Sequence, residues 1–243
     1  MWFEAVIALV SVAAGAVAAV TGFGIGSLLT PALAWQVDAR LAVAAVSIPH
    51  AIGTAFRFWL IGGHVDRRVF WSFGIMSAAG GLAGALLQER AGAPALMILF
   101  GGLLLFTAAA EWTGLARRMR FHGPLAWAAG ATSGLLGGLV GNQGGIRSAA
   151  LIGVDLPKHA FVATATAVAL MVDGARVPVY LWYVGEPLGR MGALLALATA
   201  GVVAGTVLGN RLLARIPERW FRRTVAVVLA MLGAAMLMNG IRG

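Results

Sequence analysis

The sequence predicts an all-α polytopic membrane protein built from two inverted repeats, each with a glycine-broken first segment followed by three transmembrane helices. Hydrophobic residues make up 60% of its 243 residues and charged residues only 11%, whereas an ordinary soluble domain has about 25% charged residues. The mean hydropathy is +0.88, and a water-exposed globule with so few polar residues would aggregate. The chain therefore belongs in a bilayer, and its glycines and charges predict how it folds there.

Eight apolar segments are found with a window of about 19 residues. They cover residues 3–35, 41–62, 69–87, 93–112, 124–153, 159–184, 188–209 and 219–241. Six have the length of one spanning helix, about 20 residues. The first and fifth are longer, and glycine clusters at residues 22–26 and 137–145 interrupt them. Glycine costs about 1 kcal/mol in a helix interior, so these two segments are predicted to be re-entrant or discontinuous. Non-helical backbone at that depth must be buried in protein or line a cavity.

An internal repeat shows as six residue pairs that recur in the same order when the chain is shifted by 119 or 121 residues. The pairs are Gly22 with Gly141, Gly26 with Gly145 and Arg57 with Arg176 at the first shift, and Gly80 with Gly201, Gly84 with Gly205 and Arg90 with Arg211 at the second. This order predicts a duplication, with residues 1–122 and 123–243 as two repeats of one transmembrane domain. The G-x-x-x-G faces predict close helix packing, within the chain or in a homodimer.

The loop charges predict the topology. If all eight segments cross the membrane, Lys and Arg divide almost evenly between the two faces. If the two broken segments return to the side they came from, eleven lie on one face and only four, at positions 40, 90, 190 and 242, on the other. The positive-inside rule favours the second arrangement. It leaves three full crossings per repeat, so the repeats are inverted and both termini face away from the cytoplasm.

The predicted functional site lies where the two breaks meet near the midplane, as in transporters with inverted repeats. A short half-helix follows each glycine cluster, and its N-terminus directs free N–H groups and positive dipole toward the cavity. Two such ends make an anion site. The candidate substrate-binding residues are Gly24, Gly26, Ser27, Thr30, Arg57, Asn142, Gln143, Gly145, Arg147, Ser148 and Arg176.

Charged residues inside the apolar segments support an anion site, because intramembrane charge is costly and usually faces a cavity or a partner. Arg57, Arg147 and Arg176 are the basic ones, and Asp173 is the clearest acidic one. Two alternatives stay open: Arg57 and Arg176 could extend to the interface, and Asp173 could neutralise Arg176, three residues away on one helix face. His50 and Asp173 are the candidates for proton coupling, although His50 could equally be a packed polar residue.

The sequence lacks the signature residues of several functional classes. The chain has no cysteine and only four scattered histidines, so neither a metal site nor any cofactor is predicted. It contains no Walker A lysine, no H-E-x-x-H and no G-x-S-x-G, so no enzyme is predicted. Most of the basic residues that give the net charge of +9 lie in short loops between apolar runs. Such a pattern predicts membrane topology, and no binding of nucleic acid is predicted.

The duplicated four-segment halves, the G-F-G-x-G opening at residues 22–26 followed by Pro31, and the second glycine-rich break resemble the sulfite exporter TauE/SafE family over essentially the whole chain. The resemblance implies a multi-pass protein of the bacterial inner membrane that transports, often exports, small sulfur-containing or organic anions such as sulfite or sulfoacetate. An anion channel with the same lining residues is the alternative. Two positions depart from the pattern: Ile25 interrupts a glycine run, and Ala150 stands where the repeat would place a second Pro31.

Overall fold

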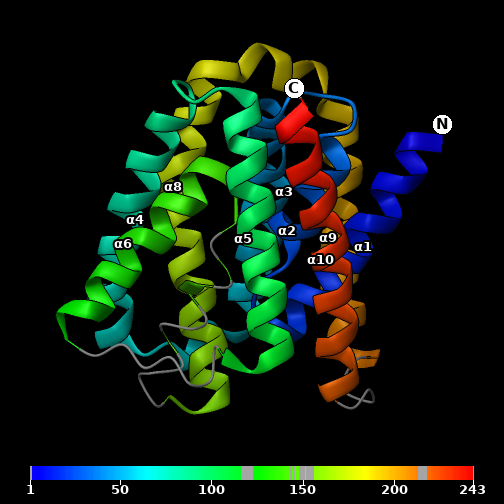
Figure 1. Cartoon of the computed structure of the whole chain (residues 1–243). Helices are drawn as coiled ribbons and strands as arrows, with labels where there is room; N and C mark the ends of the chain where they lie inside the picture. The colour runs from blue at the N-terminus through cyan, green and yellow to red at the C-terminus, as the bar shows by residue number, and fades with distance from the viewer. Residues whose placement is uncertain are drawn as a thin grey trace.

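The computed structural model of the chain describes residues 2–115, 123–142, 144, 146–147, 151, 156–212 and 218–242. All the regular structure in these residues is helical (Figure 1). The helices are α1 (Trp2–Thr21), α2 (Ile25–Leu33), α3 (Ala39–Ile61), the 3-10 turn η1 (Gly62–His64), α4 (Arg67–Gln88), α5 (Ala93–Thr113), α6 (Pro124–Val140), α8 (Lys158–Arg190), α9 (Gly192–Leu212) and α10 (Glu218–Arg242). Seven of those described are long and apolar enough to cross a membrane, namely α1, α3, α4, α5, α8, α9 and α10. The predicted all-α polytopic class is confirmed.

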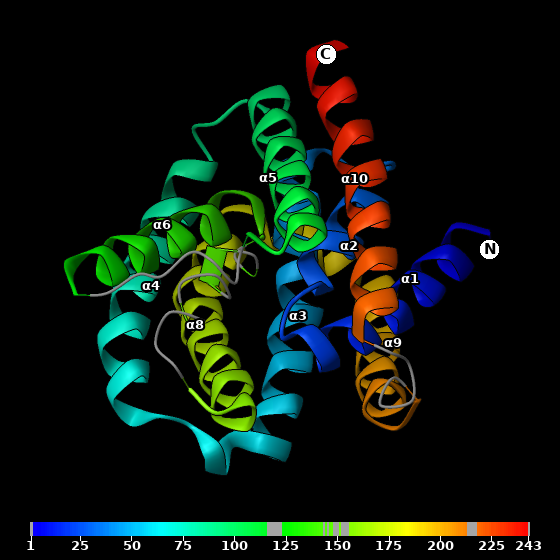
Figure 2. The ribbon, with the colours of Figure 1, turned by 60° about the horizontal axis from the view of Figure 1, so that its bottom comes forward.

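The two halves of the chain exchange helix partners. The first helix of each half packs against a helix of the other half, α1 on α9 and α6 on α4, while α5 packs on α10 and α3 on α8. Figures 1 and 2 both place the α4–α6 pair on the opposite side of the bundle from α1 and α9, with α3 and α8 between them. The central α3–α8 pair is therefore the place where side chains from both halves can meet.

Glycines set the distance between the paired helices. A Cβ added to Gly84 of α4 would lie 2.2 Å from the carbonyl oxygen of Leu135 in α6, and one added to Gly205 of α9 would lie 2.0 Å from that of Val12 in α1. Such contacts leave no room for a side chain, so the predicted close packing of the G-x-x-x-G faces is confirmed. Both faces are used within one chain, which removes them as the surface of a homodimer.

We expect Gly84→Ala to destabilise the protein by about 1–3 kcal/mol, because the added methyl group forces α4 away from α6. The matched control is Gly102→Ala in α5, where an added Cβ meets no atom within 4 Å and alanine favours the helix. Thermal unfolding of the purified variants in detergent measures both. An equal melting temperature for Gly84→Ala and the parent would show that the α4–α6 contact is looser than described.

The first glycine cluster separates α1 from α2. Gly22 and Gly24 have φ angles of 80° and 129°, in the left-handed region that side-chain-bearing residues avoid. At the end of α6, Gly141 has a φ of 73°, nearly that of Gly22, its counterpart at the 119-residue shift. Helices commonly end at a glycine in the left-handed conformation, so both predicted breaks begin with a glycine of this kind.

The predicted end of a segment at residue 184 coincides with a kink. α8 is not helical at Val184, whose φ is −128°, and a short helical stretch after the kink reaches Arg190. Pro187 lies in the first turn after the kink, where a missing N–H costs little. Arg190 then pairs with Glu186 at 2.5 Å on the exposed side of that turn. The next long helix, α9, begins at Gly192, four residues after the predicted start at 188.

Candidate functional site

The two glycine breaks lie against each other at the centre of the molecule. A Cβ added to Gly26 would be 2.3 Å from the carbonyl oxygen of Gly141. The Ser27 hydroxyl donates to the side-chain oxygen of Asn142 at 3.1 Å. Ser27 is buried in the first turn of α2, and Asn142 follows the end of α6. The structure therefore brings together predicted site residues that are more than a hundred positions apart in the chain.

Arg57 and Arg176 form the same hydrogen bond at equivalent places in the two halves. A terminal nitrogen of Arg57 donates to the carbonyl oxygen of Ala18 at 2.5 Å, and one of Arg176 to that of Gly137 at 2.6 Å. Each carbonyl also accepts the N–H of the left-handed glycine four residues later, at 3.0 Å. Both pairs of partners are related by the 119-residue shift. Each guanidinium thus stabilises the negative end of the broken helix that begins its own half.

These contacts decide between the two interpretations of the arginines. Arg57 is 4% and Arg176 1% exposed, so the alternative in which they extend to the interface is wrong. Charged side chains within a bundle usually pair with one another or with backbone carbonyls, as both of these arginines do. Because each guanidinium already donates to a carbonyl at a helix end, fewer of its N–H groups are available to a ligand than the sequence suggested.

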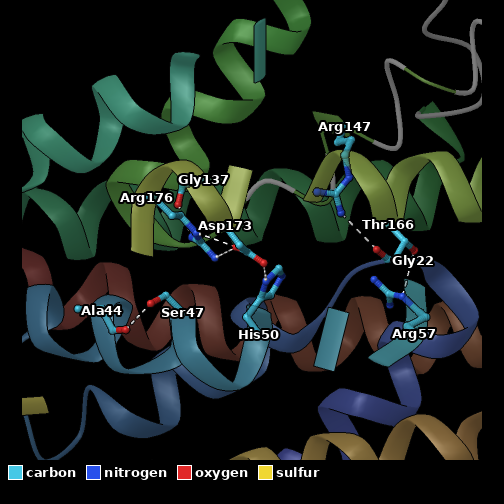
Figure 3. Close-up of polar contacts among 10 residues, drawn as sticks. All are labelled: Gly22, Ala44, Ser47, His50, Arg57, Gly137, Arg147, Thr166, Asp173 and Arg176. Atoms are coloured by element: carbon cyan, nitrogen blue, oxygen red, sulfur yellow. Dashed lines mark hydrogen bonds and ion pairs between the residues drawn. The ribbon is translucent and has the colours of Figure 1, made fainter. Parts of the chain in front are cut away.

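The neutralisation of Arg176 by Asp173 is confirmed and extends to a third residue. One oxygen of Asp173 accepts from the Arg176 Nε at 2.9 Å, and the other lies 2.7 Å from Nδ1 of His50 (Figure 3). His50 lies on α3 and Asp173 on α8, so this buried contact joins the two halves. The two candidates for proton coupling are therefore direct neighbours, which their separation in the sequence does not reveal.

Arg57 has different surroundings. The repeat places Thr54 where the second half has Asp173, and the Nε of Arg57 donates to the hydroxyl of Thr166 at 3.1 Å. Within the described part of the chain, no carboxylate forms an ion pair with Arg57. Arg57 therefore has no direct carboxylate partner among the described residues, whereas Arg176 is paired with Asp173. Sequence analysis missed Thr54, although comparing the two repeats position by position would have found it.

Arg147 is buried with donors to spare. It is 1% exposed, and one terminal nitrogen donates to the carbonyl oxygen of Gly22 at 3.3 Å (Figure 3). Among the residues that the structure describes, its Nε and its other terminal nitrogen find no partner, and neither do the hydroxyls of Thr30 and Thr54 or the amide nitrogen of Asn142. A buried donor without an acceptor costs about 1–3 kcal/mol, and native proteins leave few of them. These groups from both halves are the chemistry expected of a site that receives an acceptor-rich ligand.

Three predicted site residues, Gln143, Gly145 and Ser148, lie outside the described residues. Gly24 precedes the first residue of α2, and its lack of a side chain leaves the N-terminus of this short helix without a side-chain cap. Nowhere in the described ranges do three His, Asp or Glu side chains converge as metal ligands would.

The fold and the site together define a class: a multi-pass membrane protein with three arginines and one aspartate buried at its centre. The family model for the sulfite exporter TauE/SafE family matches residues 7–236, nearly the whole chain. The chain belongs to that family, and it is a transmembrane transporter of the sulfite-exporter type. Neither the curated proteins nor the solved structures gave a match.

Proposed function

We propose that this transporter moves a small oxyanion or sulfonate, such as sulfite or sulfoacetate, out of the cell by alternating access around the junction of the two breaks. The observation that carries the proposal is a set of buried donors without acceptors in the described part of the chain: two nitrogens of Arg147, the amide nitrogen of Asn142, and the hydroxyls of Thr30 and Thr54. A cation would find few acceptors there, whereas an anion supplies the acceptors that these groups lack.

The geometry of the donors favours an oxyanion. A guanidinium presents its nitrogens in a planar fork that matches two oxygens of one ligand. Within the described residues, the Nε and one terminal nitrogen of Arg147 have no partner, and their N–H groups point in different directions. A ligand with several oxygens can therefore accept from more than one donor of the site. The start of α2 adds positive dipole, and the three arginines exceed the one aspartate by two charges. A spherical halide would use the charge but would offer no separate oxygens to these donors.

Alternating access is supported by the way in which the halves combine. Thr30 and Thr54 come from the first half and Asn142 and Arg147 from the second, so rocking one half against the other changes the exposure of a site that both share. The exchanged helix pairs and the repeated arginine contacts fit the predicted inverted repeat. In a bacterial inner membrane, a negative interior drives anion export by about 2.3 kcal/mol per charge per 100 mV.

The channel alternative is less well supported. Arg147 and Thr30 are each 1% exposed, which fits an occluded site better than a continuously open pore. A transporter predicts that flux through proteoliposomes saturates with anion concentration, whereas an open channel predicts flux that rises in proportion to it.

The experiment that tests the proposal is a thermal-shift titration of the purified protein with sulfite, sulfate, thiosulfate, sulfoacetate, acetate and chloride. Since ligands that bind only the folded state raise its stability with concentration, we expect saturable stabilisation by at least one sulfur oxyanion or sulfonate and none by chloride. Equal stabilisation by every salt, or no stabilisation by any, would contradict an oxyanion site at the junction.

A further inference from the structure

A cavity of about 260 Å³ lies at one end of the central helix pair. It is bounded by the start of α3, the end of α4 and the part of α8 just before its kink, and Arg40 and Glu89 line it. Arg40 donates to the backbone carbonyl of Glu89 at 3.0 Å. In the predicted topology Arg40 lies on the non-cytoplasmic face, so the cavity would open there.

Two of its lining residues, Tyr180 and Gln88, are buried. The Tyr180 hydroxyl donates to the carbonyl of Gly138, and the Gln88 side-chain nitrogen donates to that of Leu139 at 3.2 Å. Both acceptors belong to the last turn of α6, which ends at Val140 and leaves its final carbonyls without helical partners. The cavity residues therefore hold the end of α6 directly before the break.

The same turn of α6 is also held from the side of the candidate site. Gly137, the residue before Gly138, accepts from Arg176, which lies one turn before Tyr180 on α8 (Figure 3). Three consecutive carbonyls are thus each bound by a side chain, the first from the buried charge cluster and the next two from the cavity wall. The last turn of α6 therefore contacts both the cavity wall and the buried charge cluster.

The other half of the chain lacks these two groups. The 119-residue shift places Ile61 at the position of Tyr180, and the 121-residue shift places Gly209 at that of Gln88. Neither side chain can donate a hydrogen bond. The end of α1 therefore keeps its arginine contact but has no counterpart of the tyrosine and glutamine bonds, so the two ends of the pathway are closed by different chemistry.

We propose that the cavity is a mouth of the anion pathway and that Tyr180 and Gln88 form the latch that closes it. The latch holds while both side chains satisfy the carbonyls of Gly138 and Leu139. It opens when these bonds break and α8 and α4 move away from the end of α6, which connects the cavity with Arg147. This inference rests on the proposed function, because it assumes that an anion passes between the breaks.

The absence of native cysteines allows a direct test. Val43 is buried, and its side chain lies 3.3 Å from the position of a Cβ on Gly141, behind the latch. We would introduce Val43→Cys and measure its labelling by a membrane-impermeant methanethiosulfonate in right-side-out spheroplasts. Labelling of Glu89→Cys, in the cavity wall, shows whether the mouth of the cavity faces the reagent. If it is not labelled in spheroplasts, the experiment is repeated with inside-out vesicles.

Removing the latch with Tyr180→Phe and Gln88→Met should accelerate labelling of Val43→Cys about tenfold, since two buried hydrogen bonds that hold the closed state are lost. Each single variant should give a smaller rise, and serves alone if the pair does not fold. Tyr183→Phe is the matched control: Tyr183 also lines the cavity, but its side chain is 45% exposed, and it should leave the rate unchanged.

Labelling at the parent rate in all latch variants would overturn the inference, and so would an equal rise in Tyr183→Phe. Labelling needs no substrate, so this result is separate from the anion titration. A latch that controls access in a protein that binds no oxyanion would refute the proposed function alone, whereas oxyanion binding without control of access would refute the latch alone.

Discussion

Arg147→Gln is expected to abolish saturable binding of the anion, with an affinity at least about 100-fold below that of the parent, because charge-assisted hydrogen bonds contribute about 1.5–3 kcal/mol. Arg147 is the buried cation with two unpartnered nitrogens, so its charge is the most available to a ligand. Glutamine keeps a polar side chain of moderate length but carries neither the charge nor the planar fork. The titration that establishes binding in the parent measures the loss.

Although Arg147→Gln is expected to abolish binding, we do not expect it to lower the stability of the protein. In the absence of ligand the Arg147 guanidinium is buried with part of its hydrogen-bonding capacity unused, and removing such a group is often neutral or stabilising. We therefore expect Arg147→Gln to melt at the same temperature as the parent or above it. Arg190→Gln is the control, since the Arg190 side chain is 78% exposed and its ion-pair partner Glu186 is equally exposed. Unchanged anion affinity in Arg147→Gln would move the site elsewhere.

Asp173→Asn is expected to destabilise the protein by about 3–5 kcal/mol, the usual cost of removing one partner from a buried ion pair. Its two carboxylate oxygens serve Arg176 and His50 at the same time. The amide is nearly isosteric but leaves Arg176 without a counter-charge and turns one acceptor into a donor. Thermal unfolding in detergent, compared with the parent at one pH, gives the difference.

The matched control for Asp173→Asn comes from the other repeat. Thr54 occupies the equivalent position, and its hydroxyl has no partner, so Thr54→Ala should change stability little. Similar losses of stability in both variants would mean that these equivalent positions tolerate no substitution, whether or not the native residue is charged. An Asp173→Asn protein as stable as the parent would show that Arg176 is stabilised by its contact with Gly137 instead.

Proton coupling can be separated from this structural role with His50→Gln. That variant keeps the Asp173–Arg176 pair and removes only the titratable imidazole. If the predicted coupling is correct, anion flux in proteoliposomes loses its dependence on an imposed pH gradient, while binding at constant pH remains. Flux that responds to the gradient as in the parent would exclude His50 as the proton carrier.

Local properties of the chain were sufficient to predict much of this protein. Hydropathy is a sum over neighbouring residues, so the polytopic class and the helices followed from it. The glycine clusters predicted two breaks, because the conformational cost of glycine acts residue by residue. The matched pairs such as Arg57 and Arg176 predicted a duplication. The family resemblance depended on the same glycines, and the match over residues 7–236 confirms it.

The tertiary structure decided what each buried polar group contacts. The sequence placed Arg57, Arg176 and Arg147 together among the candidate site residues, yet the first two each cap a helix end, while Arg147 keeps donors without partners in the described residues. The contact of His50 with Asp173, which lies 123 positions further along the chain, was likewise visible only in the tertiary structure. The physical reason is that a donor's role depends on which acceptor the packing of distant helices places beside it, and no property of neighbouring residues contains that information.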